Sequence, residues 1–130
     1  MTRTRFLSLD NVLDLHRDTI ATEGGPPGVR DLGLLESAVM MPQQQFGGDY
    51  LHPDLAAMAA AYLYHLAANH PFMDGNKRVA AMAAFVFLDV NGHELTASPD
   101  AFEAVVMGVA NGALTKAGVT QWMAEFARAQ

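Results

Sequence analysis

Hydrophobic residues recur along this chain at the three- and four-residue spacing that places them on one face of a helix. No alternating strand pattern extends beyond a few residues, and the breaks contain Gly, Pro and Asn, which end helices. The pattern therefore predicts about six helices, over residues 9–22, 32–41, 54–69, 77–90, 99–110 and 119–129.

Two of these predicted helices should form the centre of the protein. Residues 54–69 are rich in Ala and apolar on nearly every side, and residues 77–90 form a second apolar helix. We expect an all-α fold, a compact bundle of about six helices in a single domain of residues 1–130, built around this pair. The Gly- and Pro-rich residues 25–31 predict a short hairpin or flap.

Composition narrows the range of functions. The chain is 51% hydrophobic and 17% charged, with a formal net charge of −6. This charge argues against direct binding to nucleic acid or to an anionic membrane surface, since both need clustered Lys and Arg. The absence of Cys excludes disulfide and thiolate chemistry. The first ten residues lack the apolar core of a signal peptide, and the longest apolar run is too short to cross a bilayer, so we expect a cytoplasmic protein.

One nine-residue segment between the central helices, His70 to Arg78, concentrates the side chains of chemical interest. Lys77 and Arg78 are the only Lys or Arg between Asp31 and Thr115. They fall in the first turn of a predicted helix, where cations oppose the helix dipole. This unfavourable placement indicates a bound anion, most simply a phosphate.

The start of this helix has the parts of a phosphate site. Its first backbone N–H groups lack intrahelical partners, and Gly75 has no side chain to keep a phosphate away from them. Arg78 offers a forked donor, Lys77 a compact charge and Asn76 an amide donor. These four residues are therefore our candidates for phosphate binding.

Two further side chains supply the remaining chemistry. Asp74 is a hard oxygen ligand of the kind that holds Mg²⁺ together with substrate phosphates. His70 is a natural general base at neutral pH. Together with a phosphate site they suit phosphoryl or nucleotidyl transfer. The simpler alternatives are that His70 only caps helix carbonyls and that Asp74 is only a helix N-cap.

The segment His70-Pro71-Phe72-Met73-Asp74-Gly75-Asn76-Lys77-Arg78 resembles the signature of the Fic/Doc family, His-x-Phe-x-(Asp or Glu)-x-Asn-(Gly or Lys)-Arg, at every defined position. The Gly-containing residues 28–31, the predicted helix after them and the chain length are similar to the death-on-curing branch of that family. The resemblance thus extends over most of the chain.

The resemblance implies a role for each residue of the motif. His70 would deprotonate a target hydroxyl, Phe72 would anchor the loop in the core, and Asp74 would hold Mg²⁺. Gly75, Asn76 and Arg78 would cradle the phosphates of ATP.

The segment before the second predicted helix is a candidate flap that docks the substrate. Its residues of interest are Gly28, Arg30 and Asp31. For Asp31 the alternative is a plain N-cap of the helix that follows.

The residues at positions 77 and 81 indicate which branch of the family the chain resembles. Members that transfer AMP usually have Gly where this chain has Lys77 and Arg where it has Ala81, and the death-on-curing toxins resemble this chain at both. That branch is similar to kinases: it moves the γ-phosphate of ATP to a threonine of elongation factor Tu, which halts translation in the bacterial cytoplasm. A partner antitoxin, expected to bind an apolar groove, neutralises it. The alternatives are AMP transfer (AMPylation) and a non-catalytic module that binds a nucleotide or a peptide.

Residues 19–24 fit an autoinhibitory pattern of some Fic proteins, in which a Glu pairs with the second arginine of the motif. Because Ala81 stands at that position, we expect Glu23 to lack this partner and to be an ordinary helix-end residue. His16, His52 and His93 are scattered along the chain, and we assign them no role.

Overall fold

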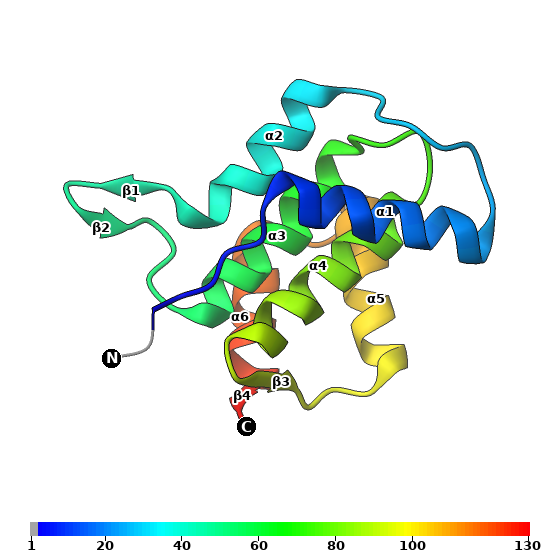
Figure 1. The fold of residues 1–130 in the computed structure, drawn as a ribbon. Helices are drawn as coiled ribbons and strands as arrows, with labels where there is room; N and C mark the ends of the chain where they lie inside the picture. Colours follow the sequence, from blue (N-terminus) through cyan, green and yellow to red (C-terminus); the bar gives the residue numbers. More distant parts are fainter. Residues whose placement is uncertain (1–2) are drawn as a thin grey trace.

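The computed structural model describes residues 3–130 and contains six α-helices in that range (Figure 1). They are α1 (Leu9–Glu23), α2 (Leu32–Met40), α3 (Leu55–Asn69), α4 (Asn76–Val90), α5 (Pro99–Ala110) and α6 (Lys116–Phe126). The all-α fold predicted from the sequence is confirmed. Met1 and Thr2, part of the segment that argued against a signal peptide, lie outside the described residues.

The central pair is α3 and α4, as expected from their composition. Both helices carry small and medium side chains that are fully buried, Ala59, Ala60 and Leu63 in α3 and Val79, Ala80 and Ala83 in α4. Small residues let the two helices approach closely, which removes apolar surface from water along their whole length. α1 packs on α4, while α2, α5 and α6 pack around α3 (Figure 1). This arrangement leaves the loop of residues 70–75 at one end of the pair. Among the helices of residues 3–130, none is long and apolar enough to cross a membrane.

Side-chain caps explain where most helices begin. Asp31 accepts a hydrogen bond from Leu34 N at 3.0 Å, and Ser8, Asp54, Ser98 and Thr115 cap their helices in the same way. Each such bond satisfies a backbone donor that has no partner within the helix. α4 is the exception among the six described α-helices, because it begins after Gly75 without a side-chain cap. Its first N–H groups are therefore left for another acceptor.

Short antiparallel strands were not predicted. β1 (Gln45–Phe46) and β2 (Asp49–Tyr50) form a hairpin that projects away from the helices (Figure 1), and its turn uses Gly47 and Gly48 at positive φ. A short 3-10 helix, Met41–Gln43, precedes it.

The prediction for the last helix was wrong at both ends. α6 begins at Lys116, because Thr115 caps it, and it ends at Phe126 rather than at residue 129. β4 (Ala127–Ala129) follows it and pairs with β3 (His93–Leu95). This pairing with a distant segment overrides the helical preference of an Ala-containing tail.

Candidate active site

The loop between α3 and α4 turns sharply at His70. His70 has φ 47° and ψ 56°, and it is the one non-glycine residue with positive φ among residues 3–130. A left-handed conformation costs a residue with a Cβ free energy, so the surrounding structure must hold it in place. The side chain is exposed at the end of α3.

The candidate flap lies along this loop and forms no hairpin of its own. Pro71 O accepts hydrogen bonds from Arg30 N at 2.7 Å and from Asp31 N at 3.1 Å. Gly28 O accepts one from Met73 N at 3.1 Å, and residues 29 and 72 form an isolated antiparallel bridge. The flap backbone is thus a strand-like brace for the loop.

The side chains of the flap also have structural tasks. The Arg30 guanidinium donates to Asn69 O at 2.8 Å and to His70 O at 2.6 Å, so it caps the end of α3. Asp31 caps α2, which bears out the simpler alternative for this residue. Direct contact of Gly28 or Arg30 with a substrate stays a prediction.

Phe72 and Asn76 close the loop from inside. Phe72 is buried, with 1% of its surface exposed. The Asn76 side chain accepts from Phe72 N at 2.9 Å and donates to Phe72 O at 3.0 Å. Both bonds fix the loop backbone. Because an amide NH2 has two hydrogens, contact of the other one with a phosphate oxygen stays a prediction.

His16 of α1 is a loop contact that sequence reasoning missed. Its ring stacks on Phe72, with centroids 3.9 Å apart and planes at 8°, and its Nε2 lies 2.9 Å from Asp74 O. The ring is buried. The sequence contained a sign of this contact, because His16 shares the apolar face of α1 with Val12. A polar group buried on such a face needs a hydrogen-bond partner.

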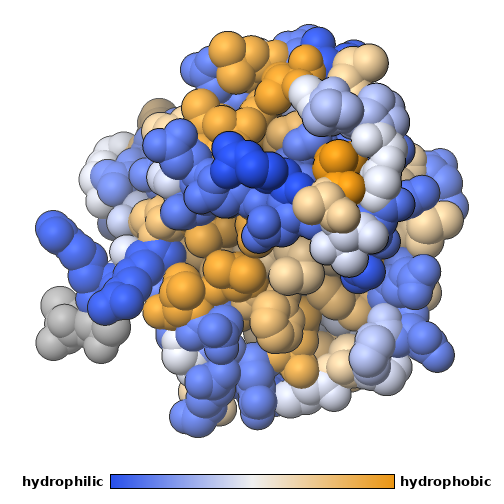
Figure 2. Space-filling view, turned by 45° about the vertical axis from the view of Figure 1, so that its right-hand side comes forward, coloured by the Kyte–Doolittle hydropathy of each residue, from blue (hydrophilic) through white to orange (hydrophobic). Residues whose placement is uncertain are grey.

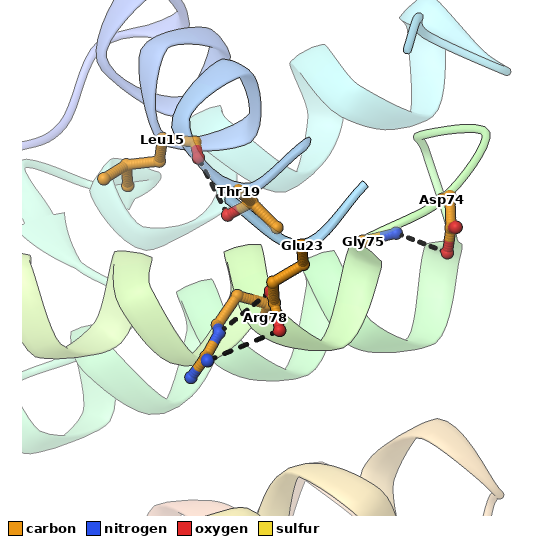
Figure 3. Close-up of polar contacts among 6 residues, drawn as sticks. All are labelled: Leu15, Thr19, Glu23, Asp74, Gly75 and Arg78. Carbon is orange, nitrogen blue, oxygen red and sulfur yellow. Dashed lines mark hydrogen bonds and ion pairs between the residues drawn. The ribbon is translucent and has the colours of Figure 1, made fainter. Parts of the chain in front are cut away.

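Asp74 and Gly75 lie where α1 passes the start of α4. The exposed Asp74 accepts a hydrogen bond at Oδ1 from Gly75 N at 2.8 Å (Figure 3). Gly75 has φ 81°, and a Cβ there would lie 3.3 Å from the Thr19 side chain. At Gly25 a Cβ would lie 2.5 Å from Asp74 Oδ2. A side chain at either glycine would therefore press on a neighbouring side chain and would also have to adopt an unfavourable positive φ.

Arg78 has a partner that we did not expect. Its Nε lies 3.1 Å from Glu23 Oε2 and its Nη2 lies 3.4 Å from Oε1 (Figure 3). The prediction that Glu23 lacks an arginine partner was wrong. Because α1 ends beside the first turn of α4, Glu23 meets the arginine at position 78 rather than the alanine at position 81. Lys77 is exposed and forms no ion pair within residues 3–130.

A single open groove of about 1050 Å³ brings six of the predicted site residues together, but not Phe72 or the flap residues Gly28, Arg30 and Asp31. One end is lined by the six candidates for catalysis, metal and phosphate binding, His70, Asp74, Gly75, Asn76, Lys77 and Arg78. The other end lies between α4 and α5 and is apolar, with Met82, Phe85, Phe102, Val106 and Met107. Figure 2 shows hydrophobic side chains gathered beside a band of hydrophilic ones on a face of the molecule.

The side chains at the polar end of the groove suit a metal ion that binds together with the phosphates of a substrate. Among residues 3–130 no group of three or more His, Cys, Asp or Glu side chains could hold a metal ion by itself. Mg²⁺, however, usually binds one or two carboxylates together with substrate phosphates and water. The exposed Asp74 beside an uncapped helix N-terminus fits this requirement.

Comparison with known proteins agrees with the motif. The sequence model of the Fic/DOC family matches residues 6–88, which include α1, α2, α3, the loop and most of α4. The chain belongs to the Fic/DOC family. It is 48% identical over 97 residues to "Toxin Doc" of Mycolicibacterium smegmatis, covering 75% of this chain and 72% of that protein. It is 33% identical over 115 residues to "Protein kinase doc" of Escherichia phage P1, covering 88% and 90%.

Proposed function

We propose that this Fic/DOC protein is a Doc-type toxin that transfers the γ-phosphate of ATP to a protein hydroxyl. The groove carries the proposal, because it joins an exposed histidine, an exposed carboxylate and an uncapped helix N-terminus with two cations. The relatives named as a toxin and as a protein kinase support it. By its resemblance to the death-on-curing toxins, the substrate would be a threonine of elongation factor Tu.

In the proposed phosphoryl transfer, each of these groove residues has its own role. The N–H groups at the start of α4, Arg78 and Lys77 bind the phosphates and hold the γ-phosphorus in the groove. His70 removes the proton of the acceptor hydroxyl, whose oxygen then forms a bond to the γ-phosphorus. The bond from that phosphorus to the β,γ-bridging oxygen breaks, and ADP leaves with its new charge opposite the same cations. Mg²⁺ held by Asp74 would neutralise phosphate charge when bound.

The apolar end of the groove would receive the antitoxin. Phe85 and Met107 keep 48% and 43% of their surface exposed although they line a cavity. Exposed apolar surface of this kind marks an interaction site, and Met adapts well to a partner. In a co-expression growth assay, Phe85→Glu with Met107→Glu should prevent neutralisation while toxicity remains. Unchanged neutralisation would place the antitoxin elsewhere.

Label transfer tests the reaction. Purified protein, Mg²⁺ and ATP labelled at either the γ- or the α-phosphate would be incubated with bacterial extract and with elongation factor Tu. We expect label from the γ-phosphate only, none with His70→Ala, and normal transfer with His93→Ala, whose side chain does not line the groove. Label from the α-phosphate only would mean AMP transfer. Nucleotide binding without any label transfer would mean a binding module.

A further inference from the structure

His16 is joined to the active loop across a long stretch of sequence. Its Nε2 lies 2.9 Å from the backbone oxygen of Asp74, 58 residues later in the chain. A carbonyl oxygen only accepts, so Nε2 carries the hydrogen and donates it. The His16 ring is 6% exposed, so this bond is shielded from water. A shielded bond of this kind is costly to leave unmade.

The same ring fixes the loop at a second point. It stacks on Phe72 with centroids 3.9 Å apart and nearly parallel planes. Phe72 is buried, and its backbone N–H and C=O are both bonded to Asn76. The loop is thus held from α1 at residue 72 by stacking and at residue 74 by a hydrogen bond.

Three contacts bear on the position of the exposed Asp74 carboxylate. His16 fixes the backbone on one side of its Cα, and Gly75 N holds its Oδ1 at 2.8 Å. Gly25 leaves room for Oδ2 only because it lacks a Cβ. Contacts from the loop, the flap and α1 thus bear on the direction of the carboxylate. Among the contacts described for Asp74, His16 supplies the one from α1.

We propose that His16 is a positioning residue for the metal-binding carboxylate of Asp74. This inference rests on the proposed function, in which Asp74 holds Mg²⁺. A site in which Asp74 is the assigned protein ligand depends on the placement of that carboxylate, because residues 3–130 contain no group of three or more such ligands that could hold the metal by itself. Loss of a partner that orients a ligand typically costs 10- to 100-fold in metal affinity or activity. His16 touches neither substrate nor metal and acts through the loop.

Three variants separate the hydrogen bond from the stacking. His16→Phe keeps a flat buried ring and removes the donor, whereas His16→Gln keeps an N–H donor and removes the ring. Asp74→Asn removes the carboxylate charge itself. Mn²⁺, used as a spectroscopic substitute for Mg²⁺, would be titrated into each protein with a non-hydrolysable ATP analogue and followed by electron paramagnetic resonance. The Mg²⁺ dependence of label transfer and the Tm would be measured in parallel.

We expect His16→Phe to weaken Mn²⁺ binding and to raise the half-saturating Mg²⁺ concentration by about 10- to 100-fold. Excess Mg²⁺ should recover most of its transfer rate, which would not happen if the variant only unfolded. His16→Gln should remain close to the unsubstituted protein in metal dependence.

Other outcomes overturn the inference. If Asp74→Asn weakens Mn²⁺ binding and His16→Phe does not, the proposed metal site stands and the role of His16 is wrong. Equal losses in His16→Phe and His16→Gln would exclude the hydrogen bond as the cause. If Asp74→Asn leaves Mn²⁺ binding unchanged, both the metal site and the role of His16 fail.

Discussion

Glu23 and Arg78 face each other at the polar end of the groove, joined by two contacts of 3.1 and 3.4 Å (Figure 3). A cation in the first turn of α4 opposes the helix dipole, and from this we inferred a bound anion. In this structure the anion is the Glu23 carboxylate. A phosphate that binds Arg78 in the proposed reaction must therefore displace Glu23 or share the guanidinium with it.

The size of this competition can be estimated from the exposure of the pair. The side chains of Arg78 and Glu23 are 58% and 45% exposed, and exposed ion pairs contribute about 1 kcal/mol at most. We expect Glu23→Gln to bind an ATP analogue more tightly, by up to about fivefold, which calorimetric titration would measure. Asp18→Asn is the matched control, because it makes the same charge change on an exposed position of α1 outside the groove. Weaker binding by Glu23→Gln would mean that Glu23 helps to hold the nucleotide.

Arg30 should hold the His70 ring in the position needed for transfer. Its guanidinium caps the carbonyls of residues 69 and 70, next to the left-handed turn. We expect Arg30→Ala to lower the rate of label transfer by about tenfold, because the His70 ring would no longer be held at one place. Arg30→Lys should lose less, since it keeps one donor. Arg17→Ala, which removes an exposed pair with Asp14, should change nothing.

The NMR signals of the His70 ring give a direct reading of this effect. They should shift or broaden in Arg30→Ala and remain unchanged in Arg17→Ala. An unchanged His70 signal together with a slower reaction would assign Arg30 to substrate docking, the role expected from the sequence.

Local pattern was enough to predict five of the six described helices and to gather the candidate site residues in one segment. Helical spacing placed five of the six described helices within one or two residues, since each has a recognisable cap or a Gly, Pro or Asn at its end. The motif itself brought the groove-lining candidates together, because nine consecutive residues fold into one loop and one helix turn.

What the sequence did not reveal are contacts between distant segments. The bond of His16 to Asp74 and the ion pair of Glu23 with Arg78 depend on how α1 crosses α4. The pairing of β4 with β3 likewise depends on a neighbour more than thirty residues away. Spacing along one element carries no information about such crossings, so these residues looked like ordinary helix positions.

The protein should lose stability in mild acid because of buried histidines. His65 Nε2 and His52 Nδ1 are buried without a hydrogen-bond partner among residues 3–130. Burial, with the nearby charge of Lys116, lowers the pKa of His65 to about 4 and also lowers the pKa of His52. The unfolded chain takes up protons near pH 6.5, whereas the folded one resists until about pH 4. The free energy of unfolding should therefore fall as pH decreases between these values.

Urea unfolding at pH 7 and pH 5 would measure this loss. Because His65 is only partly buried, water screens part of the effect, and we expect a loss of about 1 kcal/mol from it. His65→Leu should show a smaller difference between the two pH values. His93→Leu, which replaces a histidine whose Nδ1 lies 3.2 Å from Asn91 O, should keep the full difference. If the free energy of unfolding of His65→Leu falls as much between pH 7 and pH 5 as that of the unsubstituted protein, other groups cause the acid sensitivity.

Substitution of Gly75 should be unfavourable for two reasons, its positive φ and the close contact that a side chain would make with Thr19. Its φ of 81° disfavours any residue with a Cβ by about 1 kcal/mol, and that Cβ would also press on Thr19. Gly112 has nearly the same φ, 80°, but open space around it, so Gly112→Ala carries the backbone cost alone. We expect Gly75→Ala to lower the free energy of unfolding more than Gly112→Ala does, and to reduce label transfer because α1 and the loop are pushed apart. If Gly75→Ala and Gly112→Ala lose the same stability and label transfer is unimpaired, α1 can shift at little cost. The contact between α1 and the loop then does not hold the site in place.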